Sequence, residues 1–357
     1  MNILVILILF FLLAFLYGLL LRHIALRGLV LHRKFSVSTA YAGETAEMVE
    51  TVINDRPLVI PWLRVESKIS PDLRFGKRDD LEVVGDMYHR SLFTVMPYQR
   101  IVRRHRVKFL RRGVYNVGSA ALTAGDITGM FQETREQQLD MHVTVYPHLL
   151  DERELPPPVL EMTGEWTRQR QLLDDPFLVR GIREYRAGDR VRDIHWAATA
   201  RTGQMQVMMH EYAAMNRVMV LLNSQLRADQ WENLMDYEQM EIEHLISLTA
   251  TVCMHALRAG MEVGFAGNLP LTGADARISA EIPPMSGSAQ EEHLLDTMAH
   301  LKIQRTVRFP TFLESFVPPE NARIVLVTHY LDEEIRLWIR DKRSRGITVQ
   351  VIGEAEV

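Results

Sequence analysis

The sequence predicts an N-terminal membrane-spanning helix, an all-β region of the sandwich type and a C-terminal doubly wound α/β domain. Residues 3–21 form an apolar run without charge, and short β-rich runs separated by turn residues follow to about residue 150. From Arg217 onward, strands of the buried type alternate with helical periodicity. We place the four parts at residues 1–23, 24–150, 151–215 and 216–357, where the third is a linker that carries a charged motif.

The composition limits the class of protein. With 357 residues, 47% hydrophobic and 24% charged, the chain is long enough for two or three domains that each bury a core. Its 41 basic residues stand against 45 acidic ones, so we expect no nucleic-acid partner. Cys253 is the one cysteine in the sequence, which permits a reducing compartment.

The apolar run has the length of a membrane helix. At about 1.5 Å per residue, residues 3–21 nearly match a hydrocarbon core of about 30 Å. A cleaved signal peptide is the alternative, but no basic residue precedes the run and no small-x-small site follows it. Basic side chains follow the run at Arg22, Arg27, Arg33 and Lys34. They predict a single-pass protein of the inner membrane with most of the chain in the cytoplasm.

The residues next to the run leave one question open. Residues 24–31 are apolar but are interrupted by Arg27, and eight residues are too few to span a bilayer. We therefore interpret this segment as one that could lie along the membrane surface.

The β-rich region alternates short strands with turn signals, as in a sandwich. The predicted strands lie at residues 35–40, 47–53, 62–67, 90–96, 100–109, 113–117 and 142–146. Three consecutive prolines at 156–158 then predict a stiff connection that is not helical.

The C-terminal region has the pattern of an α/β domain. Strands are predicted at residues 218–222, 262–266, 323–327 and 347–352, and helices at residues 235–257, 292–301 and 333–345. Gly346 after Arg343 and Arg345 is typical of a helix C-terminus, where basic side chains favour the negative end of the dipole.

One segment of the linker is dense in arginine, aspartate, histidine and tryptophan. Gly188 before Asp189 suits a tight turn, and arginines around it can bind carboxylates in a forked geometry. We expect Tyr185, Ile194 and Trp196 to tie this turn to the core. The residues that we single out are Arg183, Tyr185, Gly188, Asp189, Arg192, Asp193, His195, Trp196 and Arg201.

This motif is similar to the signature of the domain-of-unknown-function 58 (DUF58) family, Arg-x-Tyr-x-x-Gly-Asp-x-x-Arg-x-Ile-x-Trp followed by Ala-Arg. Residues 111–115, 126–131 and 145–147 also resemble segments of that family. The resemblance implies a membrane-anchored bacterial or archaeal protein with an immunoglobulin-like β region and a C-terminal domain similar to the von Willebrand factor A fold. It also implies a partner, because members are typically encoded beside MoxR-type AAA+ ATPases. Many members start with two membrane helices, whereas this sequence has one clear candidate.

The motif allows three interpretations. It can be a structural keystone between the β and α/β parts, or a docking surface for an acidic partner segment. It can also be a catalytic site with His195 as base, oriented by Asp189 or Asp193. No serine, cysteine or lysine nucleophile stands in a recognisable frame, so we assign no catalytic residue.

The resemblance also points to a metal site and to its loss. Von Willebrand A domains that bind a divalent cation place Asp-x-Ser-x-Ser after their first strand, because a hard ion needs converging oxygen ligands. Here the three positions are Asn223, Gln225 and Arg227. Thr328 follows the later strand where a further aspartate is expected, and Asp332 is displaced. We therefore predict no metal and no cofactor.

The preferred functional hypothesis is a non-enzymatic, membrane-tethered adaptor or scaffold that acts with a MoxR-type ATPase in envelope protein assembly or maturation. One alternative is an envelope-associated hydrolase that uses His195. Another is a tether that binds anionic lipid through the basic residues of 100–112, although a solvated strand face is the ordinary interpretation of that stretch. The client, the pathway and the oligomeric state stay open.

Overall fold

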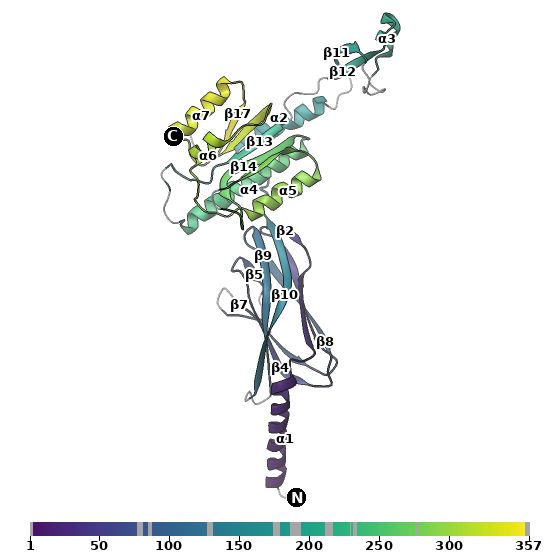
Figure 1. Cartoon of the computed structure of the whole chain (residues 1–357), viewed down its shortest axis with the longest axis vertical. Coiled ribbons are helices and arrows are strands. Elements are labelled where there is room, and N and C mark those ends of the chain that lie inside the picture. Colours follow the sequence, from purple (N-terminus) through teal and green to yellow (C-terminus); the bar gives the residue numbers. More distant parts are fainter. Residues whose placement is uncertain are drawn as a thin grey trace. The chain divides into compact units, whose positions relative to one another are not determined.

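The chain divides into two compact units, Met1–His148 and Leu149–Val357. The computed structural model describes residues 3–76, 81–84, 88–126, 131–173, 179–185, 194–210, 217–228, 230, 234–275 and 278–353. Within these residues, the predicted succession of an all-β part and an α/β part is confirmed (Figure 1).

The first unit begins with helix α1, Ile3–Ile24, which covers the apolar run. Its described side chains from Ile3 to Leu16 are exposed, and contacts with the rest of the unit begin with the Phe15 ring on Phe131 and the Tyr17 hydroxyl on Val59 O. In the described part of the chain, no helix combines the length and the apolar character that a membrane crossing requires.

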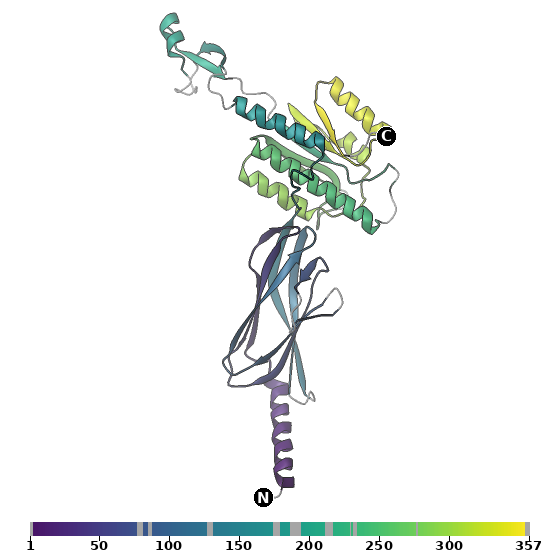
Figure 2. The same ribbon diagram turned by 180° about the vertical axis from the view of Figure 1, so that it is seen from behind.

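Two β-sheets follow α1 and face each other as a sandwich (Figures 1 and 2). Among the described residues, one sheet has the order β1-β3-β8-β5, with strands Leu29–Phe35, Thr45–Asn54, Arg100–Phe109 and Leu73–Phe75. The other has the order β2-β10-β9-β4-β7-β6, with strands Thr39–Tyr41, Gln132–Tyr146, Gly113–Gly125, Ile60–Lys68, Tyr88–Val95 and Leu81–Val84. Neighbouring strands are antiparallel except β2 and β10, which are parallel.

The sandwich core follows from strand alternation. In β1, every second residue points inward, so Leu29, Leu31, Arg33 and Phe35 share the buried face. The segment 24–31, which could lie along the membrane surface by its sequence, contributes four residues to the protein core. Ala25, Leu26, Leu29 and Leu31 are buried in one hydrophobic cluster. Leu29 and Leu31 are buried because they lie on the inward face of β1, whereas Arg27 and Val30 are exposed.

The second unit contains helix α2 (Pro157–Leu173), a β11–β12 hairpin (Val179–Glu184 and Gln206–His210), helix α3 (Trp196–Thr202) and an α/β sheet. The described strands of that sheet are β13 (Arg217–Leu222), β14 (Glu262–Pro270), β15 (Ser279–Met285), β16 (Ala322–Val327) and β17 (Val349–Ile352). Its helices are α4 (Asp236–Arg258), α5 (Ser288–His300), α6 (Phe309–Ser315) and α7 (Glu333–Ser344).

The α/β sheet is doubly wound. Its order among the described residues is β15-β14-β13-β16-β17, with β15 antiparallel at one edge and the other strands parallel. Helices α6 and α7 contribute to a hydrophobic cluster on one face, whereas α4 and α5 contact the sheet on the other (Figures 1 and 2). The strand order reverses between β13 and β16, and ligand sites of such sheets lie where the carboxyl ends of the strands meet at that point.

Three elements differ from expectation for identifiable reasons. The prolines at 156–158 do not form a non-helical connection, because α2 begins at Pro157 and proline is tolerated in the first turn of a helix. Strand β15 contains two prolines and lies at the sheet edge, which is where a sheet accepts them. Helix α6 has seven residues, too few to show helical periodicity.

The close approach of β13, β14 and β15 predicts an intolerant glycine. A Cβ added at Gly264 would lie 2.7 Å from Ile282 O and 2.7 Å from Met219 Sδ. We expect Gly264→Ala to destabilise the chain by about 1–3 kcal/mol, because overpacking at fixed backbone forces a shift. Gly118→Ala in β9 is the control, since nothing lies within 4 Å of that position. Urea unfolding followed by circular dichroism measures both, and equal stabilities would contradict the prediction.

Candidate functional site

The arginine-rich motif is described only in part. Gly188, Asp189, Arg192 and Asp193 lie outside the described residues. The described members frame the β11–β12 hairpin: the Arg183 side chain donates from Nη1 to Glu184 O at 2.9 Å, and Tyr185 N donates to Met205 O at 2.8 Å.

His195 and Trp196 start helix α3. The Nδ1 atom of His195 accepts the Ala198 N–H at 3.0 Å, so the imidazole acts as the N-cap of the helix. Because Nδ1 is the acceptor, the neutral imidazole carries its proton on Nε2, and the lone pair that a base would use is engaged in the cap. The interpretation of His195 as a catalytic base stays a prediction, and its proposed aspartate partners lie outside the described residues.

The apolar residues of the motif do not all face the core. Ile194 is buried and pairs with Val207, and Tyr185 is half-buried. Trp196, however, has 67% of its surface exposed, so the expectation that it ties the motif to the core was wrong. It lies in the first turn of α3, a seven-residue helix in which no residue is buried. Arg201 is exposed in the last turn of the same helix.

The carboxyl edge of the α/β sheet gathers the positions named from the sequence as a degenerate metal site. Asn223 directly follows β13 and Thr328 directly follows β16, the two strands at which the order reverses. Asn223 N donates to Val327 O at 2.9 Å, which ties the two strand ends together. The polar side chains at this edge are almost completely buried; they are Asn223, Ser224, Gln225, Asn268 and Thr328.

These side chains hydrogen-bond to each other and to the backbone. Asn223 Nδ2 donates to Thr328 Oγ1 at 3.0 Å, and Asn223 Oδ1 accepts from Gln225 N at 2.9 Å. Thr328 Oγ1 donates in turn to Tyr330 O at 2.7 Å. Gln225 Oε1 accepts from Phe309 N at 2.7 Å, which fixes the start of α6.

Asn268 completes this network from the neighbouring strand. Its Oδ1 accepts from Ser224 N at 2.8 Å and from Ser224 Oγ at 3.0 Å, and its Nδ2 donates to Val307 O at 3.1 Å. The edge where a cation would sit is thus filled by amides and hydroxyls with internal partners. We call this set the amide network.

The two charged residues that were named from the sequence for this edge, Asp332 and Arg227, do not join the network. Asp332 caps α7, because its Oδ1 accepts from Ile335 N at 2.8 Å. Arg227 is exposed in the loop after β13. Among the residues that the structure describes, no three His, Cys, Asp or Glu side chains gather as cation ligands. That the chain uses no metal stays a prediction.

An open groove lies beside this sheet, along α7 and β17. Its volume is about 890 Å³, and it is lined by Pro158, Leu331, Glu333, Arg336, Ile339, Arg340, Arg343, Val351 and Gly353. Three exposed arginines thus stand against one glutamate, over a floor that includes Leu331, Ile339 and Val351. We call this the arginine groove. The combination suits an acidic segment that also carries apolar side chains.

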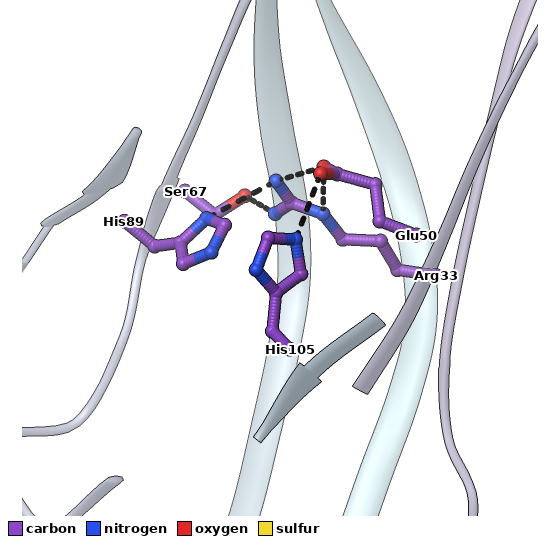
Figure 3. Close-up of polar contacts among 5 residues, drawn as sticks. All are labelled: Arg33, Glu50, Ser67, His89 and His105. Atoms are coloured by element: carbon purple, nitrogen blue, oxygen red, sulfur yellow. Dashed lines mark hydrogen bonds and ion pairs between the residues drawn. The ribbon is translucent and has the colours of Figure 1, made fainter. Parts of the chain in front are cut away.

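A second polar cluster lies in the interior of the first unit. Arg33 on β1 and Glu50 on β3 form a buried ion pair, with Arg33 Nε 2.7 Å from Glu50 Oε1 (Figure 3). Arg33 also donates to Ser67 Oγ on β4, and its Nη2 lies 3.4 Å from His89 Nδ1 on β7. His105 Nε2 on β8 lies 3.4 Å from Glu50 Oε2. We call these five residues the polar layer.

The polar layer joins the two sheets and separates two hydrophobic clusters. Arg33, Glu50 and His105 come from one sheet, and Ser67 and His89 come from the other. On β1, Leu31 before Arg33 belongs to one cluster and Phe35 after it belongs to the other. This layer was not predicted from the sequence, although Arg33 between Leu31 and Phe35 on the inward face of β1 was a visible signal.

Burial, the Arg33 charge and hydrogen bonds together set the protonation of the layer. Burial alone would raise the pKa of Glu50, but the Arg33 charge and the His105 hydrogen bond outweigh it and lower the pKa from 4.5 to about 2. Burial, aided by the Arg33 charge, lowers the pKa of His89 from 6.5 to about 3. At neutral pH the layer therefore holds the Arg33–Glu50 pair beside a neutral His89.

The polar layer predicts loss of stability in mild acid. The unfolded chain takes up a proton at His89 near pH 6.5, whereas the folded chain resists it down to about pH 3. Stability should therefore fall from about pH 6.5 downward, and between about pH 4.5 and 2 the protonation of Glu50 adds to the loss. Hydrogen exchange of peptides from β1 and β3 at several pH values measures the effect, with peptides from β13 as internal reference.

A matched variant isolates the histidine. His89→Asn keeps an acceptor close to the position of Nδ1 but cannot titrate, so its stability should be flat between pH 6.5 and 4.5. An unchanged pH dependence in this variant would show that His89 is not the group responsible.

The amide network predicts that restoring the aspartate of a metal site is harmful. Asn223→Asp places a buried carboxylate against Thr328 Oγ1, which already donates its proton to Tyr330 O. We expect Asn223→Asp to lower the free energy of unfolding by about 1–3 kcal/mol or more. The difference should shrink at low pH, because protonation removes the charge of the new carboxyl group. Thermal unfolding measures it, with Arg227→Ala as the exposed control. Rescue by added Mg²⁺ would instead reveal a latent cation site.

Comparison with known proteins supports the resemblance in the C-terminal part. Residues 181–357 match the family described as "Protein of unknown function DUF58". An "Uncharacterized protein YeaD" of Bacillus subtilis (strain 168) is 21% identical over 293 residues, which cover 80% of this chain. This chain spans 65% of the length of that relative.

Solved structures resemble about a third of the chain. The CARDB domain of the PF1109 protein of Pyrococcus furiosus, in complex with di-metal ions, is 16% identical and covers 33% of this chain and 90% of its own, with a TM-score of 0.23. The PapD-like domain 7 of human CEP192 is 12% identical and covers 33% of this chain and 86% of its own, with a TM-score of 0.23. A cohesin of the archaeon Archaeoglobus fulgidus is 9% identical and covers 32% of this chain and 88% of its own, with a TM-score of 0.23.

Proposed function

We propose that this chain is a non-enzymatic, membrane-tethered adaptor or scaffold that acts with a MoxR-type AAA+ ATPase in envelope protein assembly or maturation. The observation that carries the proposal is the arginine groove, a cavity of about 890 Å³ that offers charge and apolar surface to a partner. The resemblance to the DUF58 family supports the choice of partner.

The groove lies next to an open sheet edge, which favours an extended partner segment. Among the described residues, β17 pairs with β16 alone. Thr348 O accepts from Ile324 N of β16, and Ile352 O accepts from Thr328 N just after β16. Because successive residues of a strand direct their peptide groups to opposite sides, the N–H and C=O groups of Val349 and Val351 face the open edge. Arg343 covers one of these groups by donating from Nη2 to Val349 O at 2.7 Å, and Val351 lines the groove. An acidic segment that adds as a strand would find main-chain groups and arginines together.

The membrane tether in this proposal is α1. Its described side chains from Ile3 to Leu16 are exposed, and an exposed apolar helix is most stable in lipid. The basic residues that follow it favour a cytoplasmic location for both units, in a single-pass inner-membrane protein.

The finer assignments of fold belong to the same proposal. A central β13 flanked by β14 and β16, with an antiparallel β15 at one edge, supports a von Willebrand A-like domain. Two facing sheets in the first unit support an immunoglobulin-like region. The amide network, with its internal partners, supports a mode of partner binding that does not pass through a cation.

The arginine groove predicts a charge-sensitive contact with the ATPase. Arg336→Glu with Arg340→Glu should weaken binding of the full chain in detergent to a purified MoxR-type ATPase by at least about tenfold, since each lost charge-assisted bond contributes about 1.5–3 kcal/mol. Biolayer interferometry without nucleotide measures the dissociation constant. Binding should persist in EDTA, and Arg227→Glu should weaken it, because we expect this exposed arginine to pair with a partner carboxylate without a cation.

The control for this prediction is a charge reversal outside the groove. Arg345→Glu lies at the C-terminal end of α7 and does not line the groove, so it should bind as the unchanged chain does. If Arg345→Glu weakened binding equally, the effect would come from the overall charge of the unit, and the groove would not be the binding site. Loss of nucleotide-free binding in EDTA would overturn the cation-independent mode.

A further inference from the structure

The turns around the C-terminal part of α1 form an exposed rim at one end of the first unit. We call it the collar and define it as Arg27, Arg56, Met96, Pro97, Tyr98 and Arg100. These residues come from three separate segments: the connection between α1 and β1, the turn between β3 and β4, and the turn between β7 and β8 together with the first residue of β8, Arg100.

Hydrogen bonds hold these segments together around the helix. Asp55 N donates to Gly28 O at 3.2 Å, which joins the β3–β4 turn to the connection after α1. Tyr98 N donates to Arg56 O at 3.2 Å, and Asn54 Nδ2 donates to Met96 O at 2.9 Å. The three segments therefore form one surface at the base of the sandwich.

The helix itself is fixed to this base. Tyr17 Oη donates to Val59 O at 2.6 Å, and the Phe15 and Phe131 rings lie edge to face with centroids 5.5 Å apart. A Cβ at Gly18 would lie within 2.5 Å of the Phe131 ring, so helix and base are in direct contact. The collar thus has a defined height along α1, above the exposed stretch that ends at Leu16.

The collar combines apolar and basic groups. Tyr98 is 68% exposed and Met96 is 50% exposed, and Pro97 between them is also exposed. Arg27, Arg56 and Arg100 are exposed beside them. Tyr98 has a φ of 53°, which is uncommon for a residue with a side chain, and this turn presents the tyrosine outward. Aromatic and arginine side chains of this kind suit the boundary between hydrocarbon and anionic head groups.

The length of the exposed helix brings this surface to the boundary. Residues 3–16 span about 20 Å at about 1.5 Å per residue, whereas a hydrocarbon core measures about 30 Å. A bilayer that covers α1 from Ile3 therefore extends past Tyr17, to the level where the helix contacts the base of the sandwich. The head-group layer then coincides with the collar.

We infer that the collar lies in the head-group layer of an anionic bilayer and forms a second membrane contact beside α1. This inference rests on the proposed anchoring by α1. The inference also limits which basic residues of the stretch 100–112 can bind lipid. Strand β8 leads away from the collar at about 3.3 Å per residue, so Arg100 meets the head groups while Arg106 and Lys108 stay in solution.

Site-specific fluorescence quenching tests the inference on the full chain. Cys253 is buried and burial raises the pKa of its thiol, so introduced cysteines can be labelled selectively. Bimane is attached to Met96→Cys in the collar and, as the matched control, to Leu110→Cys just past the opposite end of β8. Leu110 is 44% exposed and Met96 is 50% exposed, so the two sites differ mainly in position. Tyr98→Cys provides a second collar site.

The labelled chains are reconstituted into phosphatidylcholine vesicles, with and without phosphatidylglycerol, that contain a head-group-proximal spin-labelled lipid. Quenching should be several-fold stronger at residue 96 than at residue 110, and stronger with phosphatidylglycerol. Arg56→Glu with Arg100→Glu, or high salt, should reduce the gain from the anionic lipid.

A third site separates failure of the inference from failure of the anchor. Leu9→Cys lies in the exposed part of α1 and should be quenched by a spin label deep in the acyl chain. Quenching at residue 9 with equally weak quenching at residues 96 and 110 would overturn the collar contact and leave the anchor intact. Lack of quenching at both residue 9 and residue 96 would overturn the anchor and the collar contact together.

Discussion

The architecture of the first unit depends on one buried ion pair, Arg33 with Glu50. Both side chains are almost completely buried, so the low-dielectric interior makes each intolerable without the other. Ser67 and His89 bring the second sheet to the same guanidinium, and the core divides into two hydrophobic clusters on either side. A register slip of one residue in β1 would turn Arg33 to solvent and leave Glu50 buried alone. The pair therefore fixes the register of β1 against β3, and the contacts of Arg33 with Ser67 and His89 join the two sheets.

The second unit places its polar groups differently. At the carboxyl edge of its sheet, the amide network joins β13, β14, β16 and the start of α6 through uncharged side chains. A charge there would need a counter-ion, whereas an amide offers a donor and an acceptor to fixed backbone groups. The edge at which related architectures bind ligands is thus used to position α6, and charged surface appears instead along α7 and β17.

The sequence predicted those elements whose pattern is local. The parallel strands of the α/β sheet, β13, β14, β16 and β17, and helices α4 and α7 were predicted from apolar periodicity and from the Gly346 C-terminus, where Gly346 has a φ of 81°. Strand β15 and helix α6 could not be found this way, because their prolines and short length mask periodicity and tertiary packing decides their state. The polar layer could not be predicted for another reason. Its members lie up to 72 residues apart, from Arg33 to His105, and only the pairing and packing of strands brings them together. Trp196 was misplaced because aromatic character does not tell a core position from an exposed one.

The direct continuation of α1 into β1 has a mechanical consequence. Four residues separate Ile24 from Leu29, and two of them, Ala25 and Leu26, are already buried in the sandwich. A load applied through the helix therefore reaches β1 without a slack linker. Strand β1 is held to β3 by antiparallel pairing from Leu29↔Asn54 to Phe35↔Met48, with bonds perpendicular to the strand. A pull along β1 shears these bonds together instead of opening them one by one, so the first unit is built to bear tension between whatever holds its N-terminal helix and whatever engages the rest of the chain.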